Sequence, residues 1–147
     1  MAIYKKLRTF SSLSYRIKWL LFKAIIISAI VKITLVFRPF KKVLNWLGKS
    51  NIESDKSSNP ESIIIRTDIK NAMMLCNKYT FWKTECYTQA LTCKLLLKKY
   101  SLPSTIYIGF YKDEVGNYKG HAWLRSYDMI LVGGSELNKF TVQSFFT

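Results

Sequence analysis

The sequence holds three cysteines and one histidine, and only one of the cysteines lies where its thiol could be activated. Cys86 follows Thr84, a typical helix N-cap residue, and opens a stretch whose apolar spacing predicts a helix over about residues 85–100. The unpaired amides and the dipole at a helix N-terminus stabilise a thiolate, which is the nucleophilic form of cysteine. Cys76 and Cys93 fall inside predicted helices, and we expect them to be core thiols.

The only imidazole, His121, is the candidate base for this thiol. It opens a predicted strand in Gly120-His121-Ala122-Trp123. A helix-start cysteine followed by a strand histidine is the order found in papain-like and transglutaminase-like enzymes, where the histidine takes the thiol proton. A core cysteine with a structural histidine is the alternative interpretation. One histidine and no Cys-x-x-Cys pair are too few ligands for a zinc site, and we expect no metal or cofactor.

The elements that must position these residues are helices followed by strands. Thr67 is predicted to cap a helix, with Asp68 in its first turn. Pro103 prevents continuation of the helix that Cys86 begins, and the apolar period then changes to two. Strands are predicted within residues 104–111, 121–126, 129–132 and 140–146, with Tyr127-Asp128 as a tight hairpin connection. This order predicts an α+β domain with an antiparallel sheet.

The positive charge of the chain is concentrated in its first third. Residues 1–50 hold eleven Lys or Arg and no Asp or Glu, whereas residues 51–147 hold twelve basic and nine acidic residues. We predict a basic helical segment over residues 1–48, a polar linker over 49–62 and the catalytic core over 63–147. A basic field of this kind attracts acidic partners, anionic lipid or nucleic acid, and a merely solvated basic face remains an alternative.

The apolar run Trp19–Phe37 is nearly long enough to span a membrane. Lys23 and Lys32 lie inside it, and each would cost about 2.5–3.5 kcal/mol near a bilayer centre. The sequence therefore favours a buried or interfacial helix. No small-residue cleavage site follows the run, so a signal peptide is not expected. We expect a cytoplasmic protein, with membrane association through residues 1–48 as an open possibility.

Several stretches together resemble a known family. They are Glu85-Cys86-Tyr87-Thr88-Gln89-Ala90-Leu91, Ile106-Tyr107-Ile108-Gly109-Phe110, His121-Ala122-Trp123-Leu124 and Val132-Gly133-Gly134. In this order they resemble the stand-alone leader peptidases of lasso-peptide biosynthesis, which are bacterial transglutaminase-like cysteine proteases. The resemblance covers roughly residues 63–147, and the basic helical first third is similar to the N-terminal part of the stand-alone members.

The resemblance implies a Cys–His–acid triad, of which Cys86 and His121 match directly. In relatives the acid follows the histidine by about a dozen residues, where this chain has Val132-Gly133-Gly134 and no carboxylate. Asp128 in the predicted hairpin is retained as the expected third member. Glu136 and a backbone carbonyl are the alternatives for orienting the imidazole.

The implied reaction is hydrolysis of the amide bond between leader and core of a ribosomally made precursor peptide, through an acyl-enzyme on Cys86. The amide of Cys86 is expected to help hold the oxyanion. Gln89 is less suited to this role, because it lies about one turn further along the helix.

Implied partners are the precursor peptide, a small separate leader-recognition protein and a ring-forming cyclase. An acyl transferase on the same pair, a non-enzymatic basic protein of an anionic membrane surface and bulk nucleic-acid binding are the competing interpretations. No nucleic-acid reading motif is present, so specific nucleic-acid recognition is not expected.

Overall fold

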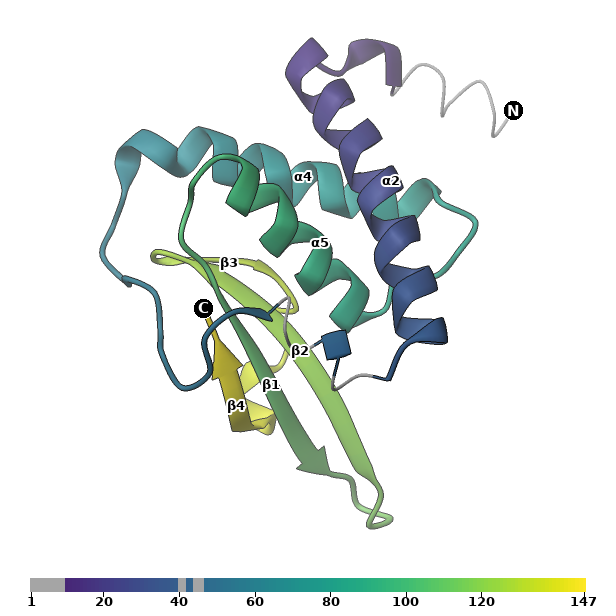
Figure 1. Cartoon of the computed structure of the whole chain (residues 1–147), viewed down its shortest axis with the longest axis vertical. Helices are drawn as coiled ribbons and strands as arrows, with labels where there is room; N and C mark the ends of the chain where they lie inside the picture. Colours follow the sequence, from purple (N-terminus) through teal and green to yellow (C-terminus); the bar gives the residue numbers. More distant parts are fainter. Residues whose placement is uncertain (1–9, 40–41, 44–46) are drawn as a thin grey trace.

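The sheet that carries His121 has four antiparallel strands in the order β3-β2-β1-β4 (Figure 1). The computed structural model describes residues 10–39, 42–43 and 47–147; the rest of the predicted segment 1–48 lies outside the described residues. The strands are β1 (Thr105–Lys112), β2 (Tyr118–Ser126), β3 (Met129–Val132) and β4 (Thr141–Phe146). The short helix η2 (Leu137–Lys139) precedes β4. Helices followed by an antiparallel sheet confirm the predicted α+β arrangement.

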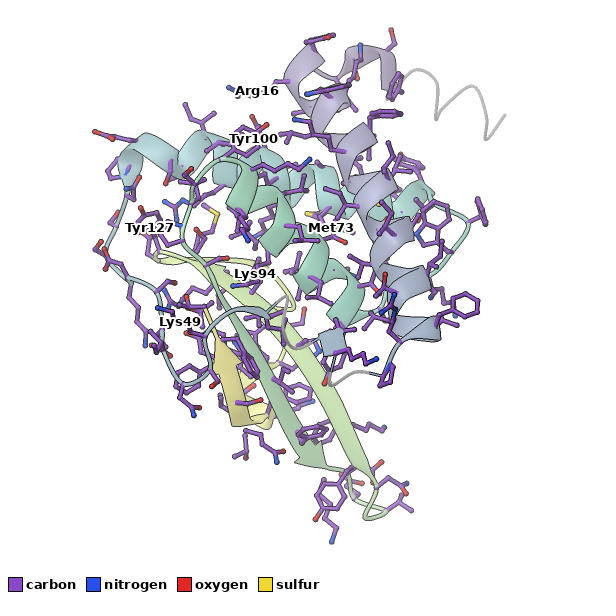
Figure 2. All side chains as sticks on the ribbon, viewed as in Figure 1. Arg16, Lys49, Met73, Lys94, Tyr100 and Tyr127 are labelled. Atoms are coloured by element: carbon purple, nitrogen blue, oxygen red, sulfur yellow. The ribbon has the colours of Figure 1, made fainter. Side chains whose placement is uncertain are left out.

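Helices cover one face of this sheet. The helices α4 (Ile63–Tyr79) and α5 (Cys86–Lys99) contact the strands, and α2 (Tyr15–Phe37) lies against both helices (Figure 1). Side chains alternate along β1 and β2, so Ile106, Ile108, Ala122 and Leu124 face the helices and are almost fully buried. Met73 of α4, labelled in Figure 2, is also fully buried in this core. The core therefore fixes α5 against the strand that carries His121.

The other face of the sheet carries an aromatic layer. The Tyr107 and Trp123 rings are opposite each other in the register of β1 and β2 and stack at 5.4 Å between centroids. Arg125 lies on the same face of β2 and donates from Nε to the Tyr107 hydroxyl at 3.0 Å and from Nη2 to the Ser54 carbonyl at 3.0 Å. This buried guanidinium holds the segment near Ser54 onto the sheet.

The predicted linker, residues 49–62, therefore runs along the molecule with defined contacts. Lys49 and Thr147 exchange two backbone hydrogen bonds, and Ser50 forms an isolated bridge with Phe146 of β4. At its end the linker forms the short helix η1 (Pro60–Ser62), in which the Ser62 amide donates to the capping Asn59 side chain at 2.9 Å. Residues 49–62 thus connect helices and strands that belong to one core.

The predicted N-cap of α4 at Thr67 is wrong by five residues, because the observed N-cap is Ser62. The helix begins at Ile63, directly after η1, and Thr67 lies inside it. Asn59 followed by Pro60 is the real start signal, because a side-chain cap and a proline at the first helical position begin the helical geometry earlier. Asp68 is not a first-turn residue; its carboxylate pairs with Arg16 of the helix α2 at 2.5 Å.

Candidate active site

Cys86 is the first residue of α5, as the sequence predicts. The N-cap residue is Glu85 rather than Thr84, and its side chain makes no capping bond. The first backbone bond of the helix runs from the Gln89 amide to the Glu85 carbonyl at 2.9 Å. The amides of the first turn therefore have no partner within the helix, and they and the helix dipole favour a negative charge at the Cys86 sulfur.

The loop before Cys86 is held by its own side chains. The buried Thr84 hydroxyl donates to the Asn77 side chain instead of capping α5. The Thr80 hydroxyl lies within hydrogen-bond distance of the Cys76 carbonyl, at 2.8 Å, and of the Trp82 carbonyl, at 3.1 Å. The Gln89 side chain donates from Nε2 to the Thr84 carbonyl at 2.6 Å. Gln89 thus positions the turn that leads to Cys86, a role the sequence does not reveal.

The three thiols are distinguished by burial. Cys76 and Cys93 have no exposed surface, whereas Cys86 is partly exposed. Burial raises the pKa of the Cys93 thiol, with a smaller contribution from Cys76. Burial also raises the pKa of Cys76, partly offset by its contact with the Ser28 hydroxyl at 3.4 Å. The two buried sulfurs are core thiols, as predicted, and Cys86 is the accessible one.

His121 lies on β2 opposite Gly109 of β1, and its imidazole is held on two sides. The ring stacks on Phe140 at 4.7 Å and on Trp123 at 6.0 Å between centroids. Its Nε2 lies 2.8 Å from the Gly133 carbonyl oxygen. A carbonyl only accepts, so this bond requires a proton on Nε2 and leaves Nδ1 with the lone pair in the neutral ring. That tautomer is the one a general base needs.

Two glycines make this arrangement possible. Gly133 has φ of +72°, and a Cβ there would meet the Ala122 carbonyl oxygen at 2.4 Å, so its carbonyl can reach the ring because no side chain is present. At Gly109 a Cβ would meet the Thr141 carbonyl oxygen at 2.9 Å and the Trp123 ring at 3.0 Å. The absence of a side chain at Gly109 lets the Trp123 ring lie across β1.

The sequence neighbours of the two candidate residues meet at the interface between α5 and β2. The Tyr87 hydroxyl lies 3.5 Å from the position that a Cβ would occupy at Gly120. Burial raises the pKa of the Tyr87 phenol, and the neighbouring Cys86 contributes in the same direction. The Tyr87 side chain, from the start of α5, therefore reaches β2 one residue before His121. The structure has no direct hydrogen bond between the Cys86 sulfur and the imidazole.

Strand alternation decides how the imidazole could approach the sulfur. Ala122 faces the helices, so His121 belongs to the aromatic face together with Trp123. The last pair between β3 and β2 is Val132 with Leu124, and beyond it the strand β2 has no partner strand on this side. No strand therefore pairs with β2 at His121 on this side, and this open edge beside Gly133 is a route by which the imidazole could reach the helix side of the sheet.

Asp128 does not lie beside His121, and the expected third member is not found there. Asp128 accepts from the Arg66 guanidinium at 2.9 Å, in the hairpin between β2 and β3. β2 runs five residues from His121 to Ser126 before this hairpin, which is roughly 16 Å of extended chain. The Arg66 guanidinium lowers the pKa of the Asp128 carboxyl. A hairpin aspartate next to a buried arginine is structural here.

The group that orients the imidazole is the Gly133 carbonyl, the backbone alternative among the sequence-based expectations. It follows His121 by twelve residues, the distance at which the family resemblance implies an acid. Glu136, the remaining carboxylate alternative, pairs with Lys139 at 2.5 Å. The sequence did not indicate Phe140 at all, because a single apolar residue before a strand gives no sign that it stacks on an imidazole.

A cavity of about 620 Å³ adjoins the aromatic layer. It is formed by β1, the start of β2, and the segment from η2 into β4, and is lined by Phe110, Tyr111, Lys112, Tyr118, Lys139, Thr141, Val142 and Gln143. Phe140, between two of these residues, packs edge-on against Tyr111 and stacks on His121. The hollow is thus lined by aromatic side chains and two lysines, and Phe140 connects its wall at Tyr111 to the imidazole. Among the described residues no cluster of His, Cys, Asp or Glu could hold a metal ion.

Comparison with known proteins agrees with this geometry. The family model described as the transglutaminase-like superfamily matches residues 31–144, more than half of the chain. No curated protein and no solved structure matches the chain. The superfamily includes cysteine peptidases and acyltransferases and consists typically of cysteine-based enzymes. With a helix-start cysteine, a strand histidine and a family match that includes both, the chain belongs to the transglutaminase-like superfamily.

Proposed function

We propose that this protein is a cysteine peptidase that removes the leader from a lasso-peptide precursor. The observation that carries the proposal is the bond between His121 Nε2 and the Gly133 carbonyl at 2.8 Å, because it leaves Nδ1 as the basic nitrogen. Cys86, the first residue of the helix α5 that packs on β2, supplies the thiol. The finer assignment to lasso-peptide maturation rests on the sequence resemblance over residues 63–147.

The chemistry has two stages. His121 takes the Cys86 thiol proton, and the sulfur attacks the carbonyl carbon at the leader–core junction. The amide of Cys86 and the other free amides of the first turn stabilise the oxyanion. The imidazolium then gives its proton to the leaving amine of the core, which breaks the amide bond and leaves the leader as a thioester. Water, deprotonated by His121, attacks the thioester and releases a free leader carboxylate and the thiol.

The supply of substrate needs partners. The proposal includes a small leader-recognition protein that delivers the precursor and a cyclase that closes the ring on the released core. The aromatic cavity beside Phe140 is the proposed position for the precursor segment next to the cut. Its lysines, Lys112 and Lys139, would favour acidic residues in that segment.

The direct test needs a lasso-peptide precursor and its leader-recognition protein, which are sought among the genes beside this one. The purified chain is incubated with both, and the products are weighed by mass spectrometry. Hydrolysis gives a free leader and a free core whose masses together equal the precursor plus one water. Hydroxylamine added to the reaction should divert part of the leader to its hydroxamate, because an amine can attack the thioester.

Matched variants identify the nucleophile. Cys86→Ala and His121→Ala should each reduce turnover by about 1000-fold or more. Cys93→Ala, which removes a buried thiol from the same helix, is the control and should retain activity. If Cys86→Ala turns over at the wild-type rate, the peptidase proposal is wrong. A leader joined to an amine acceptor, without a free leader carboxylate, would instead identify an acyl transferase.

A further inference from the structure

The helix α2 has two apolar sides, and only one of them is covered. Leu20, Ala24 and Val31 have no exposed surface and belong to the core shared with α4 and α5. On the opposite side, large apolar residues recur every three or four positions with 43–79% of their surface exposed; we call Trp19, Phe22, Ile26, Ile30, Ile33 and Phe37 the outer stripe. Figure 2 shows side chains of α2 that point away from α4 and α5.

The stripe is longer than scattered surface residues would explain. It extends over nineteen residues of helix, from position 19 to 37, and the eighteen steps between them span about 27 Å at 1.5 Å per residue. An uninterrupted apolar row of this length on a monomer indicates an interaction surface. α2 is also long and apolar enough to cross a membrane by length and composition. The apolar partner is therefore either a lipid phase or another protein.

Contacts with the protein body argue against a membrane span. The Ser28 hydroxyl lies 3.4 Å from the Cys76 sulfur, deep in the core. Lys32 donates from Nζ to the Lys83 carbonyl at 2.6 Å, and Arg16 pairs with Asp68 at 2.5 Å. A helix that crossed the bilayer would have to leave these partners and expose the buried side of the core. α2 can keep them only by lying along a surface.

The charges around the stripe specify the kind of surface. Residues 1–50 contain no Asp or Glu, so every charge near the stripe on its own chain segment is basic. Lys18 lies 5.5 Å from the Phe10 ring centroid, and Lys23 lies 5.1 Å from that of Trp19. Lys23 also lies 5.8 Å from the ring centroid of Tyr100, at the end of α5 (Figure 2). Lysines beside aromatic rings are suited to the headgroup region of an anionic bilayer.

We propose that the outer stripe docks on an anionic lipid surface, with α2 lying in the plane of the membrane interface. A second copy of the chain fits less well, because two identical basic faces would repel each other. Lys32 also lies 3.8 Å from Glu85, next to the candidate nucleophile. The docked helix therefore fixes how the start of α5 lies relative to the membrane. The inference does not depend on the peptidase assignment.

The test is flotation of the full chain with vesicles. One set contains about 30% phosphatidylglycerol in phosphatidylcholine, and the other is pure phosphatidylcholine. The wild type should float with the anionic vesicles, bind the neutral vesicles at least about tenfold more weakly, and lose part of its binding at about 0.5 M KCl. The double variant Ile26→Glu with Ile30→Glu should lower partition to anionic vesicles about 100-fold, because two isoleucines leave the apolar phase.

The matched control is Val115→Glu, which places a carboxylate on an apolar residue that is 86% exposed in the hairpin between β1 and β2. It should bind like the wild type. Circular dichroism and an unchanged number of protected thiols check the fold of each variant. The proposal is overturned if the wild type stays unbound, or if the double variant floats equally well. It is also overturned if the double variant loses only self-association or binding to the recognition protein, because the stripe would then be a protein interface.

Discussion

The Nε2 atom of His121 lies 2.8 Å from the carbonyl oxygen of Gly133, and this single bond sets the tautomer of the only imidazole in the chain. In a Cys–His–acid triad a carboxylate sets the tautomer and the orientation of the imidazole. A neutral carbonyl orients the ring equally well, but it stabilises the imidazolium less than a carboxylate does. We therefore expect a correctly oriented imidazole but a lower kcat than a carboxylate in the same position would give.

Replacement of Gly133 by alanine should move this carbonyl. The residue has φ of +72°, and the added Cβ would lie 2.4 Å from the Ala122 carbonyl oxygen. We expect kcat to fall by about tenfold or more with little change in KM, because the ring loses its orientation. Gly134→Ala is the control, since its Cβ would meet only the Ile130 side chain, at 3.2 Å. The rate of Cys86 alkylation is the second readout. An unchanged kcat and alkylation rate in Gly133→Ala would show that the carbonyl has no catalytic role.

The three thiols should differ sharply towards iodoacetamide. Cys76 and Cys93 are fully buried and burial raises the pKa of both, whereas Cys86 is partly exposed at a helix start. We expect one adduct on the folded chain near pH 7.5 and three in about 8 M urea, as counted by mass spectrometry. The folded Cys86→Ala variant should take up none. Equal labelling of Cys93 in the folded chain would contradict the packing of α5.

The sequence predicts the elements around the site well where a local signal exists. The strand Met129–Val132, the hairpin at Tyr127-Asp128 and the start of α5 at Cys86 match the structure, because alternation and helix-start chemistry are local. Thr67 is a poor guide to α4, because a good N-cap residue can also lie inside a helix that another cap begins.

The third group of the site could not be predicted from residue types. A triad search looks for a carboxylate, and the first one after His121 in the sequence, Asp128, is paired with Arg66. The Gly133 carbonyl is a backbone group, so only the chain path after β3 brings it to the ring. Gly133-Gly134 was the available signal, since paired glycines allow a close backbone approach.

Arg66 should matter to stability far more than Asp128 does. The guanidinium is 1% exposed and donates to the Ser126 and Asn59 carbonyls at 2.8 Å each, as well as to Asp128. Arg66→Ala leaves buried carbonyls without donors, and we expect the free energy of unfolding to fall by about 3 kcal/mol in urea titrations. Asp128→Asn keeps the hydrogen-bond acceptor and lies at the surface, so its effect should be small near neutral pH.

The same Asp128→Asn variant also tests the triad assignment. Its kcat should stay within about twofold of the wild-type value, because the side chain is bound to Arg66 and lies far from the imidazole along β2. In the wild type, Arg66 lowers the pKa of the Asp128 carboxyl. Any small difference in the free energy of unfolding between the wild type and Asp128→Asn should therefore disappear as the pH falls through the acid range. A loss of activity of about 100-fold at neutral pH, with the fold intact, would show that Asp128 acts in catalysis.

Lys94 gives the chain a pH-dependent stability that can be measured separately. This lysine of α5 borders a cavity of about 390 Å³ and donates to the Ser104 carbonyl at 3.1 Å (Figure 2). Burial, and then the charge of Lys98, lower the pKa of Lys94 to about 8. In the unfolded chain a lysine releases its proton only near about pH 10.4, so between these values the unfolded state holds the proton and the folded state does not. The free energy of unfolding should therefore rise with pH across this window, and the charged Lys94 should reduce stability below it.

Lys94→Met removes the buried charge but keeps the length of the side chain. We expect this variant to be more stable than the wild type at pH 7, with the difference decreasing as the pH approaches about 10. Urea titrations at several pH values, with reductant present, measure the difference. Lys99→Met, at the exposed end of the same helix, is the control and should follow the wild-type curve. If the curves of Lys94→Met and the wild type run parallel from pH 7 to pH 10, Lys94 is solvated as an ordinary surface lysine, and the close packing of α5 against Ser104 is not present in solution.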